Sequence, residues 1–213
     1  MALQIALLAR QHDRKQFDCG ESSLNEWLQR MALQQQEKNF ARTRVIVEDQ
    51  EPKRVLGYYA LLPAQVDTTH FPPGRKFPRR LPCLLLGRLA VDRIVQGRRI
   101  GELLLVDAIE RTRRSIAEIG GAGLYADALN ERAAAFYVRY GFRPLLDDPK
   151  RLFTEVRFVL RKRQVVLEKV HGRGAMKRPS RGEAIVTRLR HVARRATRST
   201  MTTDELMALT RGD

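Results

Sequence analysis

The feature of this sequence that most constrains its fold is the apolar run over residues 83–92, CLLLGRLAVD, together with the segment that follows it. A run without polar alternation is typical of a strand buried on both faces of a sheet. After the glycine- and arginine-rich residues 96–101, apolar side chains recur at helical spacing. A strand, a loop and a helix in this order predict a mixed α/β fold, with this unit at the centre of the sheet. The apolar helix positions are Leu104, Leu105, Ala108, Ile109 and Ile116.

Other segments predict the remaining strands. Residues 41–49 and 54–66 are rich in β-forming residues, and the turn-like DQEPK separates them, so we expect an antiparallel pair. The proline-rich basic residues 69–82 cannot continue either strand. Further strands are expected over residues 1–10 and 122–129, from Phe142 onward, and within 151–160.

Two more helices are indicated by spacing and by end signals. Residues 17–39 carry Leu24, Trp27, Leu28 and Met31 at helical spacing. Ser23 and Glu26 stand three residues apart, as in a capping box. The last helix is expected between an N-cap at Asn130 and a left-handed glycine at Gly141.

The formal net charge of +16 is the strongest bulk signal. Such an excess predicts attraction to a polyanion, which leaves nucleic acid, a phosphorylated ligand and an anionic membrane as possibilities. No apolar run approaches the length of about 20 residues that a membrane span needs, and residues 1–10 are interpreted as a strand rather than a signal peptide. We therefore expect no membrane association.

The two cysteines and four histidines show neither zinc-type spacing nor a disulfide framework. We therefore predict no metal site, a reduced cytoplasmic location, and simple burial of both Cys19 and Cys83. The positive charge is unevenly distributed, because residues 161–213 carry 14 Lys or Arg against 5 Asp or Glu. This shift predicts a domain over residues 1–160 and a basic C-terminal extension over 161–213.

The residues before the central helix suit an anion. A helix start leaves backbone N–H groups unpaired, glycines let the backbone come close, and arginines add bidentate contacts. An ordinary helix entry remains the alternative. The segment that combines these features is Gln96, Gly97, Arg98, Arg99, Ile100 and Gly101.

The order LGRLAVDRIVQGRRIGELLL resembles the acetyl-CoA motif of the GNAT N-acetyltransferase superfamily, Gln/Arg-x-x-Gly-x-Gly/Ala. Gln96 and Gly101 match its first and last positions, whereas Arg99 stands where the first glycine is usual. An arginine is strained there if the position requires a positive φ, and Gly97 would then relieve the turn. The resemblance implies a GNAT fold that uses acetyl-CoA.

Over residues 3–160 the chain is similar to the GNAT toxins of bacterial toxin–antitoxin systems. The resemblance rests on FDCGESSLNEWLQRMAL, ARTRVIV, VLGYYALLP, LLLGRLAVD and ERAAAFYVRYGF, in that order. It implies acetylation of the amino acid on a charged tRNA, which stops translation. The implied partners are an aminoacyl-tRNA and a cognate antitoxin protein, with a homodimer suggested by the family alone. Acetylation of a small amine or a protein is the alternative reaction.

The family also implies roles for single residues. Backbone N–H groups near Leu89, Ala90 and Val91 would polarise the thioester carbonyl. The loop over residues 96–101 would wrap the pyrophosphate, and Asn130 would contact the pantetheine arm. Tyr137 would protonate the leaving thiolate, with Tyr140 as a competitor. No general base stands out, which favours an α-amine that titrates near 8 over a lysine near 10.4.

Basic side chains near this unit are candidates for contacts with tRNA phosphates. A solvated basic face is the alternative. The candidates are Arg75, Lys76, Arg79, Arg80 and Arg93. Residues 181–213 resemble part of a Phd/YefM-like antitoxin, with a disordered basic extension as the alternative. A degenerate acetyltransferase fused to an antitoxin fragment, binding DNA or a partner without catalysis, is the rival to an enzyme.

Overall fold

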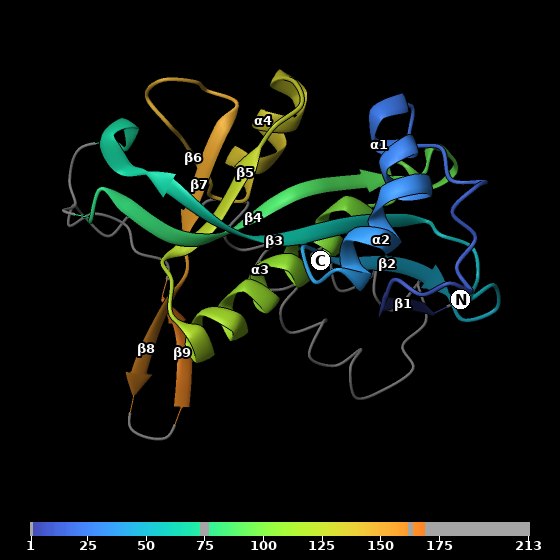
Figure 1. The fold of residues 1–213 in the computed structure, drawn as a ribbon, viewed down its shortest axis with the longest axis horizontal. Coiled ribbons are helices and arrows are strands. Elements are labelled where there is room, and N and C mark those ends of the chain that lie inside the picture. Colours follow the sequence, from blue (N-terminus) through green and yellow to red (C-terminus); the bar gives the residue numbers. More distant parts are fainter. Residues whose placement is uncertain (1, 73–76, 162–163, 169–213) are drawn as a thin grey trace, which may run out of the picture. The chain divides into compact units, whose positions relative to one another are not determined.

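The computed structural model describes residues 2–72, 77–161 and 164–168, with side chains up to residue 156. Strands and helices follow one another in the order that the sequence patterns predict (Figure 1). The strands are β1 (Leu3–Leu7), β2 (Arg42–Glu48), β3 (Gly57–Asp67), β4 (Arg80–Val91), β5 (Gly123–Asp127), β6 (Arg143–Pro144), β7 (Arg151–Glu155), β8 (Arg157–Arg161) and β9 (Gln164–Glu168). The helices are α1 (Ser22–Glu26), the π-helical η1 (Trp27–Met31), α2 (Ala32–Glu37), the 3-10 turns η2 (Thr68–His70) and η3 (Arg93–Val95), α3 (Ile100–Ile119) and α4 (Glu131–Arg139).

Seven strands form one mixed sheet in the order β1-β2-β3-β4-β5-β7-β6, and β8 pairs with β9 in a separate hairpin. The predicted antiparallel pair is confirmed, because Arg42 of β2 lies opposite Leu61 of β3. The strands β4 and β5 run parallel, with Leu84 opposite Leu124. Parallel neighbours need a long crossover, which α3 provides. The mixed α/β fold class is therefore confirmed.

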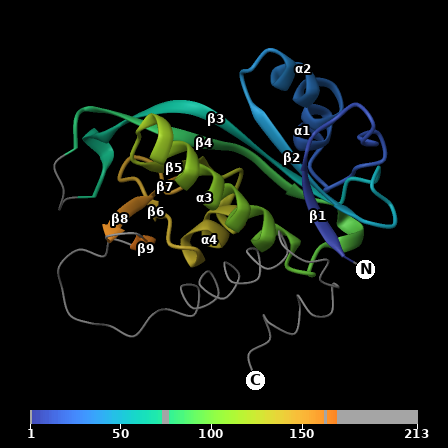
Figure 2. The same ribbon diagram turned by 90° about the horizontal axis from the view of Figure 1, so that it is seen from below.

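The first of two compact units contains residues 2–62 and 87–108 among those described. Its helical layer packs beside β2, as Figure 2 shows. An aromatic stack lies at the centre of this core: the Trp27 ring lies parallel to that of Tyr58 at 5.8 Å, and Phe17 meets Tyr58 edge-on at 5.4 Å. The Tyr58 hydroxyl donates to the carbonyl of Leu24 at 2.8 Å, which fixes α1 on the sheet.

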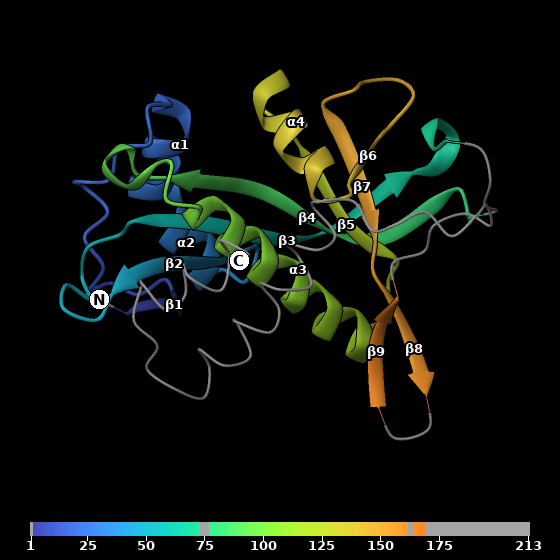
Figure 3. The ribbon, with the colours of Figure 1, turned by 180° about the vertical axis from the view of Figure 1, so that it is seen from behind.

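The second unit contains residues 63–86 and 109–161 with the hairpin end 164–168. Its core gathers around Tyr125 and Phe153, and α4 lies along β7 (Figure 3). Gly123 allows β5 and β7 to approach closely, because a Cβ atom there would lie 2.1 Å from the carbonyl oxygen of Thr154.

Burial along the two central elements tests the predicted periodicities. The expected apolar face of α3 is buried throughout, from Leu104 to Ile116. For β4 the prediction of burial on both faces was wrong in part, since Pro82 and Arg88 are exposed. An arginine cannot be buried without a compensating partner, so that side of the strand reaches solvent at Arg88.

The helix ends follow the sequence signals in one case and not in the other. Asn130 caps α4, accepting from the backbone N–H of Ala133 at 2.9 Å, and Gly141 has φ +86°. Both predictions are confirmed. The capping box was wrong: α1 begins after Glu21 with no side-chain cap. Ser23 therefore lies inside the helix rather than at its boundary.

Within the residues that the structure describes, no helix is long and apolar enough to cross a membrane, and no group of three His, Cys, Asp or Glu side chains could hold a metal ion. The predicted boundary at residue 160 falls inside β8, and the division into two domains stays a prediction. The antitoxin-like segment 181–213 lies outside the described residues, as do Arg75 and Lys76.

Candidate active site

The site begins where β4 ends and the chain turns toward α3. Asp92 is the first residue after the strand and is only 5% exposed. Its carboxylate accepts from the backbone N–H of Ile94 at 3.0 Å and from that of Asp18 at 3.2 Å. One carboxylate thus closes the turn η3 and attaches it to a segment 74 residues earlier.

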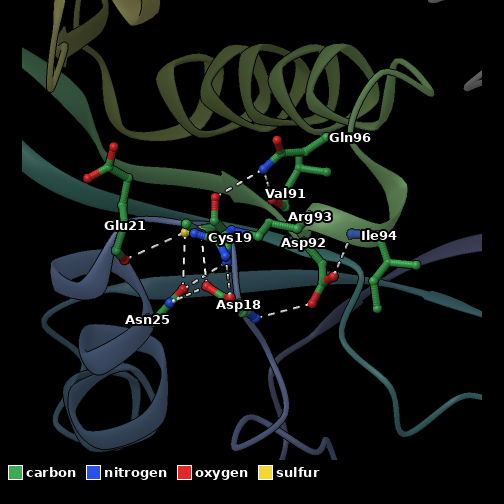
Figure 4. A network of polar contacts seen from close by, with 10 residues as sticks. Asp18, Cys19, Glu21, Asn25, Val91, Asp92, Arg93, Ile94 and Gln96 are labelled. Carbon is green, nitrogen blue, oxygen red and sulfur yellow. Dashed lines mark hydrogen bonds and ion pairs between the residues drawn. The ribbon is translucent and has the colours of Figure 1, made fainter.

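Asp18 forms the other half of this junction (Figure 4). Its side chain accepts from the backbone of Gly20 at 2.9 Å and from the amide of Asn25 at 2.8 Å. These two hydrogen bonds, aided by the Arg93 guanidinium 3.3 Å away, hold the pKa of the Asp18 carboxyl below its usual range. The backbone N–H of Arg93 also donates to the Asp18 carbonyl at 2.8 Å.

Gln96 completes the network with its side chain. Its amide nitrogen donates to the carbonyl of Val91 at 2.9 Å and to that of Cys19 at 3.0 Å. The first position of the predicted acetyl-CoA motif therefore fixes the loop to the end of β4 and to the segment around Cys19 (Figure 4). A contact of Gln96 with the cofactor stays a prediction.

The loop itself is bent by two residues in the left-handed region. Gly97 has φ +82° and Arg99 has φ +58°. Strain is expected at Arg99 if its φ is positive, and the φ of Arg99 is positive. A left-handed conformation costs a non-glycine residue roughly 1–2 kcal/mol. The sequence departs from glycine at a position whose backbone geometry favours glycine.

The same bend leaves backbone donors available. Among the described residues, no hydrogen bond takes up the N–H groups of Gly97, Ile100 and Gly101. A Cβ atom at Gly97 would meet nothing within 4 Å, so the space beside it is open. Free donors at the start of a 20-residue helix favour an anion. The residues present therefore fit the diphosphate of a coenzyme A thioester.

The predicted thioester strand, Leu89 to Val91, precedes this loop in the same unit. Ala90 is 5% exposed, and β3 comes so close to it that a Cβ atom at Gly57 would lie 3.0 Å from the Ala90 carbonyl oxygen. The structure therefore brings together two of the predicted groups, the strand end and the phosphate loop. Asn130 and Tyr137 belong to the other unit.

Tyr137 lies on α4 and is 6% exposed. Its ring packs against Phe142 at 5.3 Å and Phe136 at 5.5 Å, and burial raises the pKa of its phenol. Tyr140 is equally buried, with its ring 5.0 Å from that of Phe136. Burial does not distinguish the two tyrosines, and the role of Tyr137 stays a prediction.

The described candidates for phosphate contacts are exposed, but two already have partners. Arg93 pairs with Asp18, and Arg79 lies 3.7 Å from the Asp67 carboxylate. Arg80 is exposed at the start of β4, and Arg98 is exposed in the loop. The binding of tRNA by these residues stays a prediction.

Sequence reasoning missed the residues that anchor the loop. These residues are Asp18, Asn25 and Asp92, which lie far apart in the sequence. The signal that could have indicated them is the place of Asp18 and Asp92 within two of the motifs that carry the family resemblance. Cys19 is half-buried rather than fully buried, and its thiol contacts the Asn25 side-chain oxygen at 3.1 Å. Burial raises the pKa of that thiol. Cys83 is buried as predicted.

A central parallel strand pair, a crossover helix and a loop at the helix start that fits an anion are the features of an acyl-CoA N-acyltransferase of the GNAT class. Residues 41–144 match the family described as the acetyltransferase (GNAT) domain. Over 142 residues the chain is 38% identical to the tRNA-acetylating toxin of Mycobacterium tuberculosis. This aligned stretch covers 66% of this chain and 84% of that protein. The chain therefore belongs to the GNAT N-acetyltransferases that use acetyl-CoA, and it is a homologue of the tRNA-acetylating toxins.

Solved structures agree with this assignment. A tyrosine-to-phenylalanine mutant of KacT has a TM-score of 0.69 at 32% identity, and covers 73% of this chain and 95% of its own. AtaT complexed with acetyl-methionyl-tRNAfMet has a TM-score of 0.68 at 31% identity, with 72% and 94% covered. AtaTR bound with acetyl-CoA has a TM-score of 0.63 at 32% identity, with 72% and 93% covered. A mutant AtaT bound to the C-terminus of the antitoxin AtaR matches with the same score and identity, with 73% and 94% covered.

Proposed function

We propose that this protein transfers the acetyl group of acetyl-CoA to the α-amine of aminoacyl-tRNA and thereby acts as a translation-blocking toxin. The observation that carries the proposal is the set of N–H groups at Gly97, Ile100 and Gly101, which donate to no other described residue and follow the strand end at Val91 by one short turn. Acetyl-CoA supplies an acetyl group activated as a thioester. The similarity to the Mycobacterium tuberculosis toxin supports tRNA as the acceptor.

The residues of the first unit would bind and polarise. The loop over residues 96–101 holds the diphosphate through its backbone donors, and Arg98 adds a charge beside them. Backbone N–H groups near Leu89, Ala90 and Val91 donate to the oxygen that gains charge during transfer. Such hydrogen bonds contribute much of the rate acceleration in acyl-transfer enzymes. Asn130, at the start of α4, contacts the pantetheine arm.

Tyr137 supplies the proton that the departing thiolate needs. Burial raises the pKa of its phenol, so the proton is present at every physiological pH. An apolar surrounding also disfavours the charged thiolate and raises the pKa of the thiol. A free tyrosine is a weaker acid than a free thiol, and burial weakens the phenol further, so the transfer depends on a phenol positioned directly against the sulfur. Tyr140 is the competing donor.

An α-amine suits this reaction because no dedicated base is needed to deprotonate it. Near pH 7 an amine with a pKa of about 8 is neutral in an appreciable fraction of molecules, whereas a lysine with a pKa near 10.4 is not. The positive charge of +16 favours a polyanionic substrate. Arg79, Arg80 and Arg93, with Arg75 and Lys76, would then contact tRNA phosphates.

The partners and the location follow from the same proposal. An enzyme that acts on charged tRNA works in the cytoplasm, where translation occurs. A cognate antitoxin would restrain it, as the complex of AtaT with the C-terminus of AtaR suggests by analogy. We also propose that the protein assembles as a homodimer.

Incubation of the purified chain with labelled acetyl-CoA and charged tRNA tests the proposal. We expect acetyl-aminoacyl-tRNA as the product. The label should remain with the intact RNA, and mild base should release it as an N-acetyl amino acid. Uncharged tRNA, free amino acids and lysine peptides are the controls. Acetylation of the peptides or free amino acids alone would show that tRNA is not the acceptor. Failure to bind acetyl-CoA in calorimetry would show that the chain does not catalyse acetyl transfer.

A further inference from the structure

We infer that Arg88, held over the ring of Trp27, binds the 3′-terminal phosphodiester of aminoacyl-tRNA. The inference rests on the proposed function and adds a specific contact on the acceptor side of the reaction. Sequence reasoning assigned neither residue to the site, and the phosphate loop at residues 96–101 does not include them.

The two side chains form a layered arrangement. The guanidinium carbon of Arg88 lies 5.7 Å from the centre of the Trp27 ring. Trp27 is also stacked on the ring of Tyr58, which is fully buried and nearly parallel to it at an angle of 12°. Trp27 begins the π-helical turn η1, a local deviation that often occurs at functional sites. Trp27 is therefore held by a buried aromatic ring while it contacts Arg88.

Arg88 itself is available for a ligand. It is exposed, and its guanidinium donates to the carbonyl of the adjacent Gly87 at 2.5 Å. It forms no ion pair among the described residues. Arg93 and Arg79 differ, because each lies within 4.0 Å of a carboxylate. An oriented guanidinium without a carboxylate partner is suited to bidentate binding of a phosphate.

The position of Arg88 matches the geometry of the acceptor. Arg88 and Ala90 project from the same face of β4, because side chains alternate along a strand. Ala90 packs in the core with Tyr58, on the face that carries Trp27. Two residues of strand span about 7 Å. The guanidinium thus lies within one side-chain length of the backbone donors proposed to polarise the thioester, where the aminoacyl end of tRNA would enter.

Single-stranded RNA ends are recognised by this combination of groups. Arginine planes and aromatic rings bind unstacked nucleotides and their phosphates. A small amine or a peptide amine offers no phosphate to Arg88. A contact with the terminal phosphodiester would therefore favour tRNA over other amine substrates.

Two minimal substrates isolate the phosphodiester. Aminoacyl-adenosine contains no phosphate, whereas the aminoacyl ester of the dinucleotide CpA contains one. We expect Arg88→Gln to lower kcat/KM for the CpA ester by about 10- to 100-fold, mainly through KM, and to leave aminoacyl-adenosine within about twofold. Arg88→Lys should restore part of the loss, because it keeps the charge without the planar fork. Lys53→Gln, at an exposed turn between β2 and β3, is the matched control.

An equal loss with both substrates would assign Arg88 to the support of β4, and no loss with either would remove it from the site. Both results overturn the inference. If the unmodified protein binds acetyl-CoA but acetylates no aminoacyl ester, the proposed function fails instead, and the two failures are distinguishable.

Binding can also be followed without turnover. Trp27 is the sole tryptophan of the chain, so intrinsic fluorescence reports on the platform directly. Titration with unesterified CpA should change the Trp27 emission in the unmodified protein and in the Lys53→Gln variant. Arg88→Gln should abolish that change, and adenosine should produce none. An unchanged CpA titration in the Arg88→Gln variant would contradict the inference.

Discussion

At the scale of single residues, burial makes Tyr137 and Tyr140 look alike, and substitution is needed to separate them. Both are about 5% exposed and pack against Phe136. We expect Tyr137→Phe to lower kcat by about 100-fold or more, in the range for loss of a general acid, with the affinity for acetyl-CoA unchanged. Tyr140→Phe should retain most of the activity. The reverse pattern, measured in steady-state kinetics, would assign the proton transfer to Tyr140.

The pH profile tests the same phenol in another way. Because the pKa of Tyr137 is raised by burial, its proton is retained well above pH 9. The amine of the substrate must be neutral, so kcat/KM should rise with pH and reach a plateau above about pH 8. We expect no descending limb below about pH 10. A decline that begins near neutral pH, and that Tyr137→Phe removes, would show a phenol far more acidic than its surroundings allow.

Arg99 lets the strain in the phosphate loop be measured. Arg99→Gly and Arg99→Ala both remove the side chain, but only glycine adopts φ +58° without penalty. After the extra flexibility of unfolded glycine is subtracted, we expect the glycine variant to be more stable than the alanine variant by about 0.5–1 kcal/mol. Urea unfolding of the two proteins gives this difference. Equal stabilities would show that the loop bears no backbone strain at this position.

At the scale of elements, Asp92 connects strand β4, the turn η3 and the segment that precedes α1. Replacing its carboxylate with an amide in Asp92→Asn leaves only one oxygen to accept from Ile94 and Asp18. We expect a loss of about 1–3 kcal/mol in the free energy of unfolding and weaker acetyl-CoA binding. Asp148→Asn, which alters a local turn around Lys150, should cost less than about 0.5 kcal/mol. Similar losses of stability in both variants would mean that the Asp92 carboxylate stabilises the fold no more than an ordinary surface turn does.

The elements also show how far periodicity alone can go. Helical spacing correctly predicted the buried face of α3, because that face is determined by residues close in the sequence. The capping box at Ser23 failed because helix starts depend on contacts outside the helix, here between Asn25 and Asp18. The predicted burial of β4 failed at Arg88, where the partner ring of Trp27 comes from another element. The junction around Asp92 could not be predicted, since no local pattern encodes a contact across 74 residues.

At the scale of the whole molecule, the net charge of +16 predicts how substrate binding responds to salt. Each phosphate contact releases counterions, so affinity falls steeply as the salt concentration rises. Between about 50 and 200 mM salt we expect kcat/KM for full-length charged tRNA to fall at least tenfold. The aminoacyl-adenosine substrate, which has no phosphate, should be nearly unaffected. A tRNA reaction insensitive to salt would mean that the basic residues do not contact the backbone.

The hydrogen bond between Gln96 and Cys19 has a consequence during synthesis on the ribosome. The two residues are separated by 77 positions, so Cys19 emerges from the exit tunnel several seconds before Gln96. The loop cannot reach its final shape while the chain is still short, and a prematurely terminated product would lack an organised coenzyme pocket. A toxin of the proposed kind therefore cannot act on the ribosome that synthesises it until the segment from Cys19 to Gln96 has been released.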